Sequence, residues 1–126
     1  MPSTYRNLIS FSWSSDPLRS AAFYAEVLGL PKVFEADGWI EFAVPGTRNA
    51  YLAINHWTQD ERAPRNDFLT LGVDDLDAFK ARLEAAGVRL KGGILALEEQ
   101  RLRLLKFYDP DGNVITLAEI REAAAR

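Results

Sequence analysis

Residues 16–30 (DPLRSAAFYAEVLGL) and residues 74–88 (DDLDAFKARLEAAGV) carry the same pattern 58 positions apart. Each stretch begins with Asp, places Leu two residues later and Glu eight residues after that, and ends with Gly followed by an aliphatic residue. An Asp before the first turn and a left-handed Gly after the last turn are typical of a short helix. The chain is therefore predicted to contain two copies of one supersecondary unit, with a binding cavity between the copies.

Strand patterns surround the first of these helices. The predicted elements of this unit are a strand at 8–13, a helix at 17–28, and strands at 32–36, 39–44 and 50–55. Asp16 and Pro17 suit the N-cap and the first helical position. The dipeptide Asp37-Gly38 is a strong signal for a tight turn between two antiparallel strands. These elements make one β-α-β-β-β unit.

The second copy repeats the order with weaker strand signals. Its predicted elements are a strand at 68–73, a helix at 76–86, a weak strand at 90–93, and strands at 102–108 and 114–120. Asp74 is predicted to cap the helix together with Asp77, as in a capping box. Residues 109–113 (DPDGN) predict a tight turn, residues 94–100 are ambiguous, and residues 121–126 are predicted to form a frayed helical turn.

Length and order together predict the architecture. The 126 residues suit one domain, 1–126, with module one at about 5–55, a linker at 56–66 and module two at about 67–120. We expect an α+β fold in which two tandem βαβββ modules form a paired, curved mixed sheet around a cleft. Each helix covers one face of its sheet, so the other faces are expected to be buried against each other or against a ligand.

Composition excludes several classes of function. The chain has no cysteine, which excludes disulfides and thiolate chemistry and fits a reducing cytoplasm. It has no apolar run long enough to cross a membrane. The net charge is −3 and no Lys/Arg cluster stands out, so neither DNA nor RNA is an expected partner.

Three motifs in this order resemble the vicinal oxygen chelate superfamily, which includes glyoxalase I, bleomycin- and fosfomycin-resistance proteins and extradiol dioxygenases. The first motif is residues 15–24 with 27–30, the second is residues 73–76, and the third is the 109–113 turn before a final strand. The resemblance extends over about residues 8–120. It implies the two-module fold, a small-molecule ligand and a homodimer.

The metal enzymes of that family hold a divalent cation with His and Glu ligands from the first and last strands of both units. Carried over by position, those places correspond to Ile9, Ala53, Phe68 and Thr116, none of which is a plausible ligand. A register one residue different would bring in Asp67 alone, and one carboxylate does not make a site. The resemblance therefore implies a member without the usual metal centre and without a cofactor.

Aromatic residues are the best candidates for the cleft wall, because flat rings suit a flat organic ligand. The predicted ligand-binding residues are Phe11, Trp13, Trp39, Tyr51, Asn55, Phe68, Arg103, Phe107 and Thr116. Alternatively, the aromatic residues form a dry core or a dimer interface, and Arg103 faces solvent instead of clamping a carboxylate or phosphate. His56, the single histidine, is either a general base at the cleft rim or a surface loop residue.

Three functions remain open at this stage. The first is a metal-independent protein that binds a small organic ligand in the cytoplasm. The second is an enzyme of the same superfamily, a lyase, isomerase or dioxygenase, with a non-standard site such as Asp67 with Glu41 and His56. The third is a dimer module whose groove is filled by its partner. No catalytic residue is assigned, and whether the protein is an enzyme stays undecided.

Overall fold

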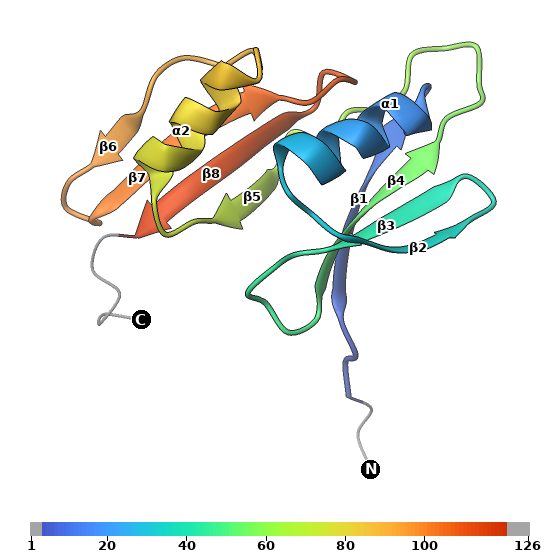
Figure 1. Ribbon diagram of the computed structural model, residues 1–126, viewed down its shortest axis with the longest axis horizontal. Helices are drawn as coiled ribbons and strands as arrows, with labels where there is room; N and C mark the ends of the chain where they lie inside the picture. Colours follow the sequence, from blue (N-terminus) through green and yellow to red (C-terminus); the bar gives the residue numbers. More distant parts are fainter. Residues whose placement is uncertain (1–3, 121–126) are drawn as a thin grey trace. The chain divides into compact units, whose positions relative to one another are not determined.

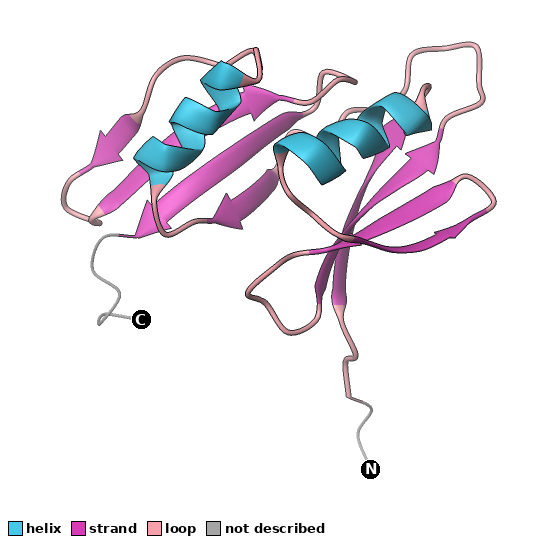
Figure 2. Cartoon of the chain, viewed as in Figure 1, coloured by secondary structure: helices cyan, strands magenta, loops and turns pink. Residues whose placement is uncertain are grey.

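The computed structural model describes residues 4–120, and this part of the chain divides into two compact units. Among the described residues, unit 1 comprises 4–65 and unit 2 comprises 66–120 (Figure 1). Within the described residues, each unit contains one four-stranded mixed sheet and a helical segment over one face of that sheet (Figure 2). The predicted α+β fold of two βαβββ modules is confirmed. The prediction for residues 121–126 lies outside the described residues.

Unit 1 follows the predicted order of elements. Its elements are β1 (Leu8–Ser14), α1 (Pro17–Ala22), the π-helical turn η1 (Phe23–Val27), β2 (Lys32–Ala36), β3 (Trp39–Ala43) and β4 (Ala50–His56). The strand order is β1-β4-β3-β2, with β1 parallel to β4 and the other pairs antiparallel. Asp37 and Gly38 both have positive φ (50° and 83°), as the two-residue turn between β2 and β3 requires.

Unit 2 has the same topology. Its elements are β5 (Leu69–Gly72), α2 (Leu76–Ala85), β6 (Leu95–Leu97), β7 (Leu102–Tyr108) and β8 (Val114–Ile120). The strand order is β5-β8-β7-β6, and β5 is parallel to β8. The predicted strand at 90–93 is wrong: only Leu90 makes an isolated bridge, to Phe107. Gly92 has φ +80°, a left-handed conformation that interrupts pairing, and the chain pairs again at β6.

The two helices begin at capping aspartates, but not at the pair that the repeat predicts. The Asp16 carboxylate accepts a hydrogen bond from the Arg19 N–H (3.3 Å), as expected. In unit 2 the cap is Asp75, which accepts from the Ala78 N–H (3.0 Å), so the prediction of Asp74 is wrong. Either aspartate could cap a helix in isolation. In the fold, the Leu76 N–H donates a hydrogen bond to Glu119 of β8, so Leu76 is the first helical residue and Asp75 is the cap.

A one-residue difference between the helices explains the π-helical turn. The segment from Asp16 to Gly29 is one residue longer than the segment from Asp75 to Gly87. Both glycines have positive φ, 72° and 73°, so the two helical segments end in the same way. The additional residue is taken up where the Leu28 N–H bonds to the carbonyl of Phe23, five residues earlier.

The turn between β7 and β8 is held by side chains, as its sequence predicts. One oxygen of Asp109 accepts hydrogen bonds from the backbone N–H groups of Asp111 and Asn113, both at 2.9 Å. Its other oxygen accepts from the Asn113 side-chain amide at 2.8 Å. The amide oxygen of Asn113 in turn accepts from the Asn66 N–H (2.9 Å). The turn therefore anchors the segment that leads into β5.

Each sheet has a helix-covered face and an opposite face. In unit 1, Ser14 contacts Ser20 of α1 (3.2 Å between hydroxyl oxygens) and Phe42 packs against Tyr24 of η1, so these strand residues define the covered face. Strand register then determines the other face. We call it the open face of unit 1, and it consists of Ile9, Phe11, Trp13, Phe34, Ala36, Trp39, Glu41, Ala43, Tyr51, Ala53 and Asn55.

Candidate functional site

A chain of four aromatic rings lies on and beside the open face of unit 1. Phe11 is its centre: its ring centroid is 5.3 Å from that of Trp13 and 5.8 Å from that of Trp39. Trp13 also meets Trp57, at 5.3 Å and with the rings steeply inclined. Edge-to-face pairs at these distances are favourable ring contacts. The rings form a continuous aromatic surface across β1 and β3.

Strand register brings these rings together. Trp13 pairs with Asn55 of β4, and Asn55 pairs with Trp39 of β3, so the three side chains form one row across the sheet. Tyr51 of β4 lies on the same face and is the direct pairing partner of Ile9 on β1. All five predicted residues in unit 1 therefore share the open face. Their role in binding stays a prediction.

Sequence reasoning missed Trp57 as a part of this surface, because it lies in the segment predicted to be a linker. The Trp57 backbone N–H donates to the Ser14 carbonyl (2.8 Å), and its indole N–H donates to the Glu61 carbonyl (2.8 Å). These two bonds hold the ring beside Trp13. Phe34, which is 55% exposed, was also missed, although strand alternation from Ala36 would have placed it on this face.

Two predicted residues of unit 2 lie on or next to the face opposite α2. Thr116 of β8 pairs with Thr70 of β5 and Lys106 of β7. Phe68 immediately precedes β5 and is 90% exposed. A large apolar side chain this exposed is compatible with a binding role, which stays a prediction.

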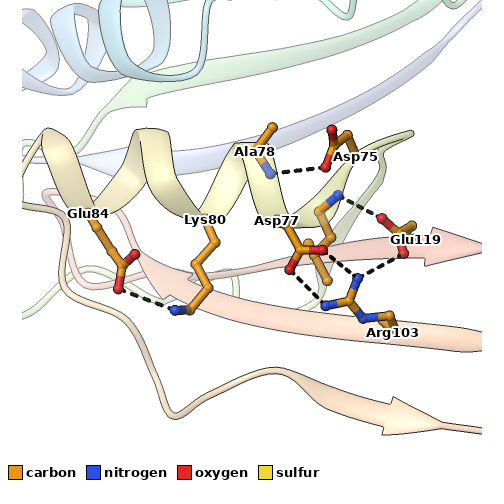
Figure 3. Close-up of polar contacts among 8 residues, drawn as sticks. Asp75, Asp77, Ala78, Lys80, Glu84, Arg103 and Glu119 are labelled. Atoms are coloured by element: carbon orange, nitrogen blue, oxygen red, sulfur yellow. Dashed lines mark hydrogen bonds and ion pairs between the residues drawn. The ribbon is translucent and has the colours of Figure 1, made fainter.

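Arg103 lies on the other face of unit 2, where it binds the start of α2 (Figure 3). Its guanidinium makes a bidentate contact with Asp77 (2.9 and 3.1 Å) and a further bond to Glu119 (3.2 Å). The second oxygen of Glu119 accepts the Leu76 N–H (2.8 Å), the first amide of the helix. The hydrogen bond to Asp77 and the nearby Glu119 raise the pKa of Arg103. The prediction that Arg103 lines the cleft is wrong.

Phe107 shares that covered face. It lies four residues after Arg103 on β7, so strand alternation directs both side chains toward α2. Phe107 is fully buried, like its neighbour Leu105 on the same face. It is a core residue, and the prediction that it lines the cleft is wrong as well.

The residues suggested for an alternative acid–base site have separate surroundings. His56 follows Ile54 on the helix-covered side of β4, so it projects away from Glu41, which lies on the open face. Asp67 accepts the Val114 N–H (3.1 Å) and fastens the segment before β5 to β8. Within unit 1, the register therefore assembles no acid–base pair from Glu41 and His56.

The family's metal ligands do not fit the residues present here. Ile9 and Ala53 lie on the open face of unit 1, and Thr116 and Phe68 occupy the matching places in unit 2. None has the imidazole or carboxylate that such a centre requires. Among residues 4–120, no group of three or more His, Cys, Asp or Glu is arranged to hold a metal ion.

Comparison with known proteins identifies the family. The sequence profile of the glyoxalase/bleomycin resistance protein/dioxygenase superfamily matches residues 12–117. The chain belongs to this superfamily. A search of curated proteins found no match. In the described part of this superfamily member, no helix is long and apolar enough to cross a membrane.

Solved structures of the superfamily show the same fold. The chain is similar to TnmS3, an antibiotic binding protein from Streptomyces sp. CB03234, with 27% identity and a TM-score of 0.79 over 95% of this chain and 99% of that one. A glyoxalase/bleomycin resistance protein from the same organism shares 30% identity, with a TM-score of 0.73, over 89% and 98% of the two chains. Lactoylglutathione lyase from Agrobacterium tumefaciens shares the fold at 21% identity (TM-score 0.73, 94% and 95% covered).

Proposed function

We propose that this superfamily member binds a flat organic ligand on the open face of unit 1, without a metal ion. The observation that carries the proposal is the chain of rings formed by Trp39, Phe11, Trp13 and Trp57. Such a surface buries a planar molecule by stacking and apolar contact. Asn55, between two of the rings, supplies a polar contact. The antibiotic-binding activity of a 27% identical relative supports this class of function.

Tryptophan fluorescence tests this proposal directly. All three tryptophans of the chain belong to the aromatic surface, so a ligand that stacks there must alter their emission. We expect a planar tricyclic probe such as acridine to quench this emission in a saturable manner. Replacement Phe11→Ala is expected to weaken binding about tenfold, because it removes the ring that contacts two others.

A matched control tests whether the loss of affinity in Phe11→Ala arises at the aromatic surface. Phe79→Ala removes a phenyl ring from α2 of unit 2, where it contacts Arg82, and should leave the affinity unchanged. Equal loss of affinity in both variants would show that truncation acts through stability alone. Binding should also persist in EDTA. If a chelator abolished it, the metal-independent part of the proposal would fail.

The alternative function is an enzyme of the same superfamily, a lyase, isomerase or dioxygenase with a non-standard site. Such an enzyme would need acid–base side chains within reach of one substrate, but the register directs Glu41 and His56 to opposite faces of the unit 1 sheet. Turnover of a thiol adduct of methylglyoxal or of a catechol, lost in a His56→Ala variant, would favour the enzyme over the binding protein.

We also propose that the protein acts in the cytoplasm as a homodimer. The absence of cysteine supports a reducing compartment. Exposed apolar side chains such as Phe68 and Leu95 are available for burial in a subunit interface. Light scattering at micromolar concentration tests this directly, and a monomeric mass would contradict the dimer.

A further inference from the structure

Glu41 has an unusual position on the aromatic face. In strand register it lies in the row Phe11–Ala53–Glu41–Phe34, with apolar side chains on either side. Of the residues that form the open face of unit 1, Glu41 alone is charged at neutral pH. Apolar neighbours offer a carboxylate no hydrogen-bond donors, so its partners must come from elsewhere.

Within the described residues, Glu41 has a single hydrogen-bond partner. The indole N–H of Trp39 donates a hydrogen bond to one oxygen of Glu41 (3.0 Å). In residues 4–120, Glu41 forms no ion pair and its second oxygen accepts no hydrogen bond. That oxygen is not sealed from solvent, since no side-chain polar atom of the described residues is both buried and unpartnered. One acceptor on the aromatic face is therefore available to a ligand.

Other carboxylates on the two sheets are arranged differently. Glu35, on β2 beside Glu41 in the sheet, forms an ion pair with Lys32 (2.7 Å). Glu119 on β8 forms an ion pair with Arg103 and also accepts a helix N–H. Glu41 thus lacks the cation that its counterparts have, and the rings around it are surfaces to which cations bind.

We infer that Glu41 selects planar ligands that carry a positive charge, such as a protonated nitrogen heterocycle or a flat amidinium. The inference rests on the proposed function, because it takes the aromatic face as the ligand site. The rings of Phe11 and Trp39 attract the cation through their π faces. The free oxygen of Glu41 accepts a charge-assisted hydrogen bond or neutralises the charge. A neutral ligand of the same shape gains the stacking and leaves the carboxylate unpaired.

A pair of probes with one shape and different charge tests the inference. N-methylacridinium is a permanent cation, and acridine is neutral in mildly alkaline buffer. We expect calorimetric titration of the intact protein to show at least about tenfold tighter binding of the cation, the range of a cation–π contact plus an ion pair. Tryptophan quenching by both probes would place them on the same face.

Substitution assigns the preference to one carboxylate. Glu41→Gln keeps the side-chain shape and removes the charge, so it should abolish the preference for N-methylacridinium and leave acridine binding nearly unchanged. Glu35→Gln is the matched control: it removes a carboxylate from the neighbouring strand on the other face and should keep the preference.

The outcomes separate the inference from the proposed function. Equal binding of both probes, unaffected by Glu41→Gln, overturns the role of Glu41 while the aromatic site stands. Loss of both probes in a folded Glu41→Gln variant also overturns it, since the carboxylate would then only position Trp39. If neither probe binds the unmodified protein or changes its tryptophan emission, the proposed function fails and the inference falls with it.

Discussion

Arg103 and Glu41 are two charged strand residues whose roles follow from the face that carries them. Arg103 is only 16% exposed because it lies under the start of α2, where two carboxylates surround it. Glu41 lies among rings, with one hydrogen bond from Trp39. The first charge is satisfied inside the protein and the second is available to a ligand. A shift of one position along either strand would move the charged side chain to the other face of its sheet and so change its role.

The first prediction concerns Arg103. An Arg103→Met variant keeps the aliphatic stem and removes the guanidinium that bridges Asp77 and Glu119. We expect a lower melting temperature by calorimetry, because Glu119 would keep a largely buried carboxylate without its cation. Lys106→Met on the exposed face of the same strand is the control and should melt close to the unmodified protein. Equal melting of both variants would contradict a role for Arg103 in holding α2.

The raised pKa of Arg103 also sets how its contribution varies with pH. The folded protein holds this proton more tightly than the unfolded chain, so the stabilisation is fully present below the ordinary arginine pKa. It declines only as the pH rises beyond that strongly alkaline range. The difference in melting temperature between Arg103→Met and the unmodified protein should therefore not shrink between neutral and mildly alkaline buffer. A clear decrease over that range would argue against this ion pair as the cause.

At the scale of elements, the helices show how one repeat tolerates a length difference. Both end at a left-handed glycine, yet the first is one residue longer from its cap. An α-helix that absorbed this residue would rotate its end by about 100° relative to the sheet. The π-helical turn η1 takes up the residue instead, and Tyr24 and Leu28 remain buried.

The second prediction compares two neighbouring aspartates before α2. Asp75→Ala removes the carboxylate that accepts the Ala78 N–H and should lower the free energy of unfolding by about 1 kcal/mol. Asp74→Ala, which removes the aspartate that the repeat alone points to, should change it much less. Urea unfolding monitored by circular dichroism measures both. A larger effect at Asp74 would mean that the helix begins one residue earlier.

At the scale of the whole molecule, the third prediction separates metal from organic ligand. We expect Ni²⁺, Co²⁺, Zn²⁺, Mn²⁺ and Fe²⁺ to leave the melting temperature of chelator-treated protein unchanged, because Ile9, Ala53, Phe68 and Thr116 stand at the ligand positions. A planar ligand at a hundredfold excess over its Kd should stabilise the fold by about 2.7 kcal/mol. A saturable shift of the melting temperature with any of these metals would contradict the prediction that the usual metal centre is absent.

Much of the fold could be predicted from local patterns. The Asp16 cap, the Asp37-Gly38 turn and the Asp109–Asn113 turn each involve residues only a few positions apart, so their conformations follow from nearby side chains. The shared face of Phe11 and Trp13 could be predicted for a similar reason, since alternation along a strand has a period of two. That Trp39 lies on the same face depends on the register of β3 and β4.

The sequence by itself determined the order of the elements, the family and the aromatic character of the candidate site, because these depend on local caps, turns and alternation. Tertiary structure alone decided that Arg103 and Phe107 lie under α2, that β6 begins at Leu95, and that Trp57 joins the rings. The physical reason is that the face of a strand is defined only relative to its partner strands and its helix. Those partners are distant in sequence, and their register cannot be read from any one segment.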